Sequence, residues 1–134
     1  MNFTPISSLR LLLRSLNLED AEQMFSYRSE KNINQFQSRI PEKLEDTIDF
    51  IENLTAEFGE DKSWFQLGIV EKASDQLIGD IGIHFNDNSS HLIELGISLA
   101  KNFHGKGYAK EALQSLIHFL KNDLATKVIQ VSVD

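Results

Sequence analysis

Two glycines separated by one residue, Gly105 and Gly107, stand directly before a stretch with the hydrophobic spacing of an amphipathic helix. A helix start presents unpaired N–H donors and the positive end of the helix dipole, and both favour an anionic group such as a phosphate. Glycine lets the backbone approach phosphate oxygens, and Lys106 and Lys110 add positive charge. The pattern therefore predicts a pyrophosphate cradle, although the glycines alone fit a purely structural strand-to-helix turn equally well.

Other phosphate-binding motifs do not match this turn. The third glycine of a dinucleotide-binding fold is missing, and the turn follows a series of strands instead of opening a strand–helix–strand unit. The Gly-Lys-Ser/Thr ending of a P-loop is also missing, which disfavours nucleotide hydrolysis.

The composition narrows the class of protein and of ligand. A length of 134 residues with 41% hydrophobic residues predicts one globular domain, residues 1–134, around a single core. The net charge of −7 disfavours nucleic acid, because nucleic-acid binders normally present a basic face. With no cysteine, thiolate zinc sites and cysteine nucleophiles are excluded, and a cytoplasmic location fits. The apolar run Leu11–Leu13 is too short to span a bilayer, so no membrane partner is expected.

The elements that must position the glycine turn follow from hydrophobic periodicity. Short apolar runs predict strands, apolar residues at helical spacing predict helices, and polar links between three successive runs predict an antiparallel meander. Asn17 and Asp20 resemble a capping box at the start of the first helix. In chain order the expected elements are a strand at Leu9–Arg14, a helix at Leu18–Glu30, a helix from Pro41 to about Gly59, strands at Trp64–Glu71, Leu77–Phe85 and His91–Leu99, a helix at Gly107–Asn122 and a strand at Lys127–Val133.

The stretch from Ile93 to Leu113 resembles the acetyl-CoA signature of the GNAT superfamily of N-acetyltransferases, Gln/Arg-x-x-Gly-x-Gly/Ala. Gly107 and Ala109 match this signature, and His104 stands where the family usually has Gln or Arg. We expect the histidine to alter cofactor affinity and not to abolish binding, because the neighbouring positions contribute mainly backbone amides.

Two further stretches strengthen the resemblance. Leu9–Arg14, followed by Glu19–Glu22, is similar to the opening of the branch that includes ribosomal-protein N-terminal acetyltransferases and spermidine acetyltransferases. Trp64–Ile83 is similar to the second and third strands of that branch. The resemblance implies an α+β fold in which a mixed, largely antiparallel central sheet is flanked by helices in the order β-α-α-β-β-β-α-β.

By resemblance, the chain transfers an acetyl group from acetyl-CoA to a primary amine, either a protein N-terminal α-amino group or a small polyamine, without a metal. The strand end would pair with the pantetheine arm, one of its amides would polarise the thioester carbonyl, and the turn amides would hold the pyrophosphate. The implied cofactor contacts are Ile97, Ser98, Leu99, Gly105, Lys106, Gly107, Tyr108, Ala109 and Lys110.

Glu94 is the predicted catalytic base, because it precedes these contacts on the same strand and matches a position where the branch often has an acid. Strand alternation places Glu94, Gly96 and Ser98 on one face, which would have to line the cleft; a solvent-facing glutamate is the alternative. His84 and His91 are alternative bases.

Two further side chains receive structural interpretations. His118 is expected to be a structural residue among core positions of the last helix, and Trp64 is expected to pack on the sheet. Acceptor specificity is expected to reside in the loop Ser29–Ile40, whose sequence does not identify the amine.

The chain ends at Asp134, which resembles the end of the family's fifth strand. Family members usually continue with a further helix and a last pair of strands, so the domain is expected to be C-terminally short. An uncovered strand would expose an unpaired edge, which predicts a homodimer. Two alternatives remain at this stage: a CoA-binding or interaction module without catalysis, and a generic α+β scaffold whose glycine turn is only structural.

Overall fold

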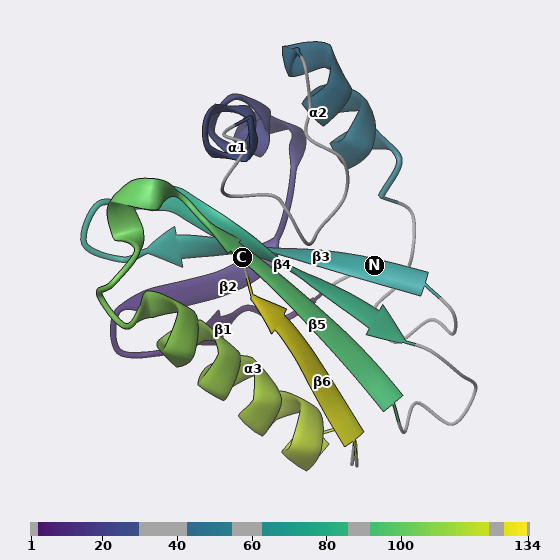
Figure 1. Ribbon diagram of the computed structural model, residues 1–134, viewed down its shortest axis with the longest axis vertical. Helices are drawn as coiled ribbons and strands as arrows, with labels where there is room; N and C mark the ends of the chain where they lie inside the picture. Colours follow the sequence, from purple (N-terminus) through teal and green to yellow (C-terminus); the bar gives the residue numbers. More distant parts are fainter. Residues whose placement is uncertain (1–2, 30–42, 55–62, 86–91, 124–127, 134) are drawn as a thin grey trace.

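The computed structural model describes residues 3–29, 43–54, 63–85, 92–123 and 128–133. Its elements form one sheet with helices on both sides (Figure 1). In chain order they are β1 (Ile6–Ser7), β2 (Leu11–Ser15), the 3-10 helix η1 (Leu18–Asp20), α1 (Ala21–Arg28), α2 (Leu44–Glu52), β3 (Ser63–Glu71), β4 (Gln76–Phe85), β5 (Leu92–Leu99), the 3-10 helix η2 (Lys101–Phe103), α3 (Tyr108–Asp123) and β6 (Val128–Val133).

The six strands lie side by side in sequence order. Strands β1 to β5 are antiparallel to their neighbours, whereas β6 lies parallel to β5, from Leu92 opposite Val128 to Ile97 opposite Val133. A parallel neighbour requires a crossover connection, and α3 provides it. The sheet is therefore mixed and largely antiparallel, and the α+β fold expected from the sequence is confirmed.

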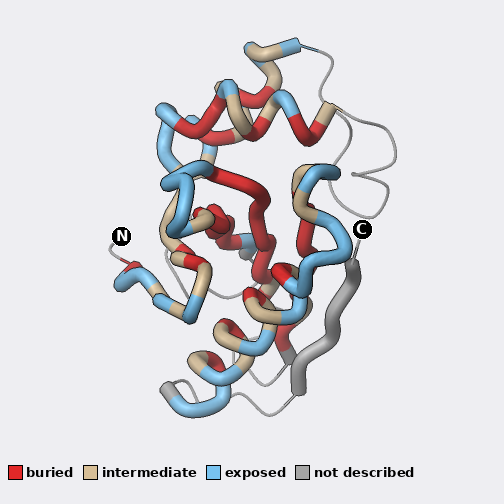
Figure 2. Tube along the Cα trace, turned by 90° about the vertical axis from the view of Figure 1, so that its left-hand side faces the viewer, coloured by how far each residue is buried: buried red, intermediate tan, exposed pale blue. Residues whose placement is uncertain are grey.

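Helix α3 covers one face of the sheet (Figure 1). Alternate residues of β2 to β5 point toward it, and Ile81, Ile83 and Phe85 of β4 are fully buried. Ala112, Leu116 and Leu120 recur at helical spacing and face the same core. Figure 2 shows this buried layer running through the strands, with the exposed residues of α3 on its outer side.

Helices α1 and α2 cover part of the opposite face. Met24 and Tyr27 of α1 pack with Ile51 of α2 and with Val70 and Leu77 of the sheet. This face also carries buried polar groups, including Asp80 and Ser98, which lie opposite each other on β4 and β5.

Most predicted elements are present, with corrections near their ends. The capping box at Asn17 and Asp20 is confirmed, but it opens a 3-10 turn, and α1 begins only at Ala21. The predicted first strand begins at Leu11, two residues late, because Ser8 N–H donates to the Leu11 carbonyl and closes a turn there. The strand β1, which pairs across this turn, was not predicted.

The second helix is shorter than predicted. It ends at Glu52, because Asn53 takes a non-helical C-cap conformation and Leu54 N–H bonds to the Ile51 carbonyl. The predicted limits at Pro41 and Gly59 lie outside the described residues, as does the loop 30–40.

The interpretation of His118 as a core residue was wrong. Its side chain is exposed on the outer side of α3, next to Asn122. Trp64 lies on the sheet as predicted, but 50% of its surface remains exposed, and its ring stacks on His84. Within the described residues, no helix is long and apolar enough to cross a membrane.

Candidate functional site

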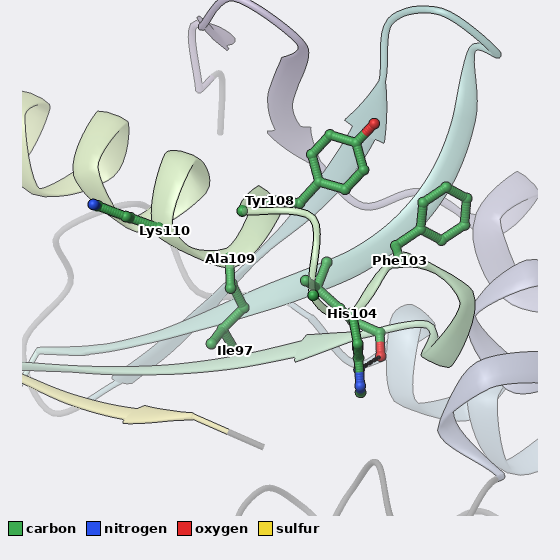
Figure 3. A pocket seen from close by; sticks show the side chains of 9 residues that line it. Ile97, Phe103, His104, Tyr108, Ala109 and Lys110 are labelled. Atoms are coloured by element: carbon green, nitrogen blue, oxygen red, sulfur yellow. Dashed lines mark hydrogen bonds between the residues drawn. The ribbon is translucent and has the colours of Figure 1, made fainter.

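A cavity of about 380 Å³ opens where β5 ends and α3 begins (Figure 3). Ile97 and Ala109 lie next to each other in it, while the phenol of Tyr108 points away. The cavity joins the end of a strand to the first turn of a helix across a short loop. Its lining residues are Ile97, Leu99, Phe103, His104, Gly105, Gly107, Tyr108, Ala109 and Lys110.

The backbone of the loop depends on its glycines. Gly105 has φ +74° and Gly107 has φ +81°, both in the left-handed region that residues with a Cβ adopt at a cost. A Cβ at Gly105 would meet nothing within 4 Å, so space exists on that side of the loop. The glycines therefore give the loop its shape and leave its surface open.

The first turn of α3 lines the cavity and has amides without an acceptor in the helix. The first helical bond of α3 runs from Glu111 N–H to the Gly107 carbonyl. The N–H groups of Tyr108, Ala109 and Lys110, which belong to cavity-lining residues, therefore have no acceptor within the helix. Three such donors at the positive end of a 16-residue helix favour an anion.

His104 ties the loop to the end of β5. Its Nε2 lies 2.9 Å from the Leu99 carbonyl oxygen, and since a carbonyl only accepts, Nε2 carries the proton (Figure 3). The ring also lines the cavity, so the residue that departs from the family signature lies at the site itself.

Glu94 lies on the other face of β5 from the cavity. It pairs in register with His84, whose Nδ1 is 3.4 Å from Glu94 Oε1, and its side chain is 44% exposed. The exposed Trp64 stacks on His84 with ring centroids 4.6 Å apart. The structure thus places Glu94 beside His84, which is one of the two alternative bases. The other alternative, His91, lies outside the described residues.

Seven of the nine predicted cofactor contacts line the cavity. Ser98 does not, because it points to the α1 side of the sheet and is fully buried beside Asp80. Lys106 is exposed, with its Nζ 5.6 Å from the centre of the Phe103 ring. Sequence reasoning missed Phe103 as a lining residue, although an aromatic residue just before His104 was a usable signal.

Two carboxylates, those of Glu71 and Glu111, form hydrogen bonds at the first turn of α3. The Tyr108 hydroxyl donates to Glu71 Oε2 at 2.5 Å; this bond lowers the pKa of Glu71 and raises that of Tyr108. Burial tends to raise the pKa of Glu111, but hydrogen bonds from Ser8 and Arg10 outweigh it and lower that pKa. Both carboxylates are therefore held in their charged form.

The strand order of the sheet, the glycine loop and the unpaired amides at the start of α3 match the features expected of an acetyltransferase. The model of the acetyltransferase (GNAT) domain family matches residues 10–134. The chain therefore belongs to the GNAT family, and it is an N-acetyltransferase that uses acetyl-CoA as the acetyl donor.

The curated relatives of the chain are also named N-acetyltransferases. An uncharacterized N-acetyltransferase, p20, from Bacillus licheniformis is 30% identical over 93% of this chain and 70% of its own length. The chain spans 64% to 70% of the length of the curated relatives that it matches.

Solved structures share the fold. A GNAT-family acetyltransferase from Bacillus anthracis superposes with a TM-score of 0.80 at 23% identity, covering 96% of this chain and 72% of the other. A Vibrio cholerae protein assigned as a ribosomal-protein-serine acetyltransferase gives 0.81 at 22% identity, covering 100% of this chain and 76% of the other.

Proposed function

We propose that the cavity at the end of β5 is the acetyl-CoA site and that the protein acetylates a primary amine, either a protein N-terminal α-amino group or a small polyamine. The observation that carries this proposal is that the first turn of α3, with three amides that have no acceptor within the helix, lines a cavity beside two glycines at positive φ.

The residues present fit the phosphate end of the cofactor. The amides of Tyr108, Ala109 and Lys110 would donate hydrogen bonds to the pyrophosphate oxygens, and the open side of Gly105 would let these oxygens approach. Lys106 and Lys110 are both exposed beside the loop and would add positive charge.

The pantetheine arm would run beside the end of β5. The described pairing of β5 with β6 ends at Ile97, so Ser98 and Leu99 lie beyond it. The apolar walls contributed by Ile97, Leu99 and Phe103 suit a largely aliphatic arm. When bound, the cofactor supplies a thioester that an amine can attack, and a strand-end amide would stabilise the charge that develops on the carbonyl oxygen.

Glu94 would remove the proton that the attacking amine must lose. An α-amino group has a pKa of about 8 and an alkyl amine of about 10.5, so both are mostly protonated at neutral pH. Glu94 precedes Ile97 by three residues, about 10 Å along the strand, and lies on the other face of β5. The amine would therefore have to approach the thioester from the α1 side of the sheet, and its proton would pass to Glu94 through water. His84 lies beside this carboxylate and would orient it.

The net charge of the chain and the assignment of one structural neighbour support the proposed class of acceptor. A net charge of −7 favours a cationic acceptor. The half-exposed ring of Trp64 stacks on His84, and His84 in turn lies beside Glu94. The Vibrio cholerae neighbour is assigned as a ribosomal-protein-serine acetyltransferase, and this name supports a protein acceptor. A panel of N-terminal peptides and polyamines would identify the amine.

The test is the release of free CoA thiol from acetyl-CoA with this panel. Glu94→Gln should lower kcat about 10²- to 10⁴-fold, the usual contribution of a general base, and leave the KM for acetyl-CoA unchanged. Glu22→Gln on the exposed side of α1 is the control and should leave kcat as it is.

Two results would count against this proposal. An unchanged kcat in Glu94→Gln would remove Glu94 from the chemistry. CoA binding without turnover of any acceptor would support the alternative of a non-catalytic CoA-binding module.

A further inference from the structure

Arg10 lies in the bend between β1 and β2 and reaches the glycine loop some 100 residues further along the chain. Its Nε donates to Glu111 Oε1 at 2.7 Å, its own N–H donates to Glu111 Oε2 at 2.8 Å, and its Nη1 donates to the Lys106 carbonyl at 3.0 Å. Ser8 Oγ adds a bond to Glu111 Oε2 at 2.5 Å. One guanidinium thus links the first turn of α3 to the peptide between the two glycines.

The same guanidinium packs on the first residue of α3. Its Cζ lies 4.2 Å from the centre of the Tyr108 ring, a cation–π distance, and the Tyr108 hydroxyl is held by Glu71 at the end of β3. Tyr108 therefore contacts two charged groups, one from the bend between β1 and β2 and one from the end of β3.

Arg10 stands behind the loop and not in the cavity. It is absent from the cavity lining, and its Nη2 lies 3.4 Å from the position that a Cβ on Gly107 would take. It therefore contacts the loop from outside the cavity.

We propose that Arg10 is a positioning residue for the cofactor site and fixes the glycine loop in the shape that binds pyrophosphate. This inference rests on the proposed function of the cavity. Gly105 and Gly107 have the widest backbone freedom of any residue, so the peptide that joins Lys106 to Gly107 can rotate unless something holds it. The bond from Arg10 to the Lys106 carbonyl holds that peptide, and the pair with Glu111 holds the arginine.

Lysine cannot replace this arginine. A guanidinium is a planar fork that serves Lys106 and Glu111 at once, whereas an ammonium is a single point of charge. Arg10→Lys therefore keeps the positive charge near the site and removes only the geometry.

The experiment compares the dissociation constants of CoA and of pantetheine, which lacks the pyrophosphate and the nucleotide, by calorimetry. In the unaltered protein CoA should bind much more tightly. Arg10→Lys should weaken CoA about tenfold and leave pantetheine unchanged, because only CoA uses the loop. A general loss of structure would weaken both.

The matched control is Arg14→Lys on β2. Arg14 also forms a two-pronged pair, with Asp20 at 2.8 and 2.9 Å, but its partner stands directly before α1 and not in α3. Arg14→Lys should therefore leave the preference for CoA over pantetheine intact. If Arg10→Lys fails to fold, Glu111→Gln, which leaves the arginine and weakens its anchor, should reduce the same preference.

The outcomes separate the two proposals. If the unaltered protein binds CoA no better than pantetheine, the pyrophosphate cradle fails, and the proposed function fails with it. If it prefers CoA and Arg10→Lys keeps that preference in full, or loses affinity for both ligands equally, the role of Arg10 is overturned alone.

Discussion

Asp80 is fully buried at the centre of β4 and is satisfied by two neighbours from α1. Arg28 Nη2 donates to its Oδ1 at 2.8 Å, and the Tyr27 hydroxyl donates to its Oδ2. Burial raises the pKa of Tyr27 well above its ordinary value, and the charge of Asp80 raises it further, so the phenol stays protonated and donates. This cluster fixes the end of α1 to the middle of the sheet.

Replacing the aspartate should be costly. Asp80→Asn removes the charge that pairs with the buried Arg28, and breaking such a pair typically lowers the free energy of unfolding by about 3–5 kcal/mol. Urea unfolding would measure this loss of stability. The control is Asp49→Asn on the exposed side of α2, whose free energy of unfolding should stay within about 0.5 kcal/mol of that of the unaltered protein. A loss below about 1 kcal/mol for Asp80→Asn would contradict a dry, paired cluster.

Single residues were the hardest feature to predict from sequence. The lining residues from Gly105 to Lys110 could be named because the family signature covers them. The burial of the Ser98 side chain and the contacts of Arg10 were not predicted, because they depend on partners distant in sequence, Asp80 for one and Glu111 for the other. No local pattern carries that information. The predicted cofactor contact at Ser98 stays a prediction.

At the scale of elements, the loop between β5 and α3 is where backbone conformation and function meet. Positive φ angles at Gly105 and Gly107 turn the chain from the strand into the helix within a few residues, and η2 and His104 brace the strand side.

A side chain at Gly107 should strain this loop. Gly107→Ala should lower the free energy of unfolding by about 1–2 kcal/mol, the cost of a left-handed residue with a Cβ, and weaken CoA binding. Gly107→Asn should cost less, because asparagine visits this conformation more readily. Denaturant unfolding of both variants, beside Gln114→Ala on the exposed side of α3, measures the difference. Equal stability of Gly107→Ala and the unaltered protein would mean that the loop does not need glycine.

The elements themselves were largely predictable. Alternation and polar links identified the meander of β3, β4 and β5, and the box at Asn17 and Asp20 marked a helix start. Strand β1 has only two residues, so it carries no periodic signal; it exists because the turn at Ser8 brings it against β2. Helix ends such as Asn53 were missed for a similar reason, since a cap is set by local geometry and not by hydrophobic spacing.

At the scale of the whole molecule, the fold joins two cores across one sheet, and charged contacts tie the N-terminal strands to α3. A homodimer and a cytoplasmic location remain predictions from the sequence. The acetyltransferase family follows from the chain as a whole, because the family model matches residues 10–134.

Stability should fall in acid because carboxylates at this junction have lowered pKa values. Glu71 and Glu111 titrate below their ordinary value of 4.5 in the folded protein, so they bind protons more readily when unfolded. Their stabilisation is complete above that value and is lost as the pH falls through the lowered pKa values. Thermal unfolding between pH 6 and 3 should show this decline, and Glu111→Gln should make it less steep. An identical slope in that variant would show that Glu111 does not contribute.

The central claim is that the glycine loop and the start of α3 bind acetyl-CoA, and the melting temperature tests it most directly. A ligand at 100 times its dissociation constant stabilises the folded state by about 2.7 kcal/mol, enough to raise Tm by several degrees. Saturating acetyl-CoA should therefore raise the Tm of the unaltered protein. Gly107→Trp should abolish the rise by distorting the loop, because a side chain at this positive φ is strained and meets Arg10. An unchanged Tm in the unaltered protein with saturating acetyl-CoA would contradict the claim.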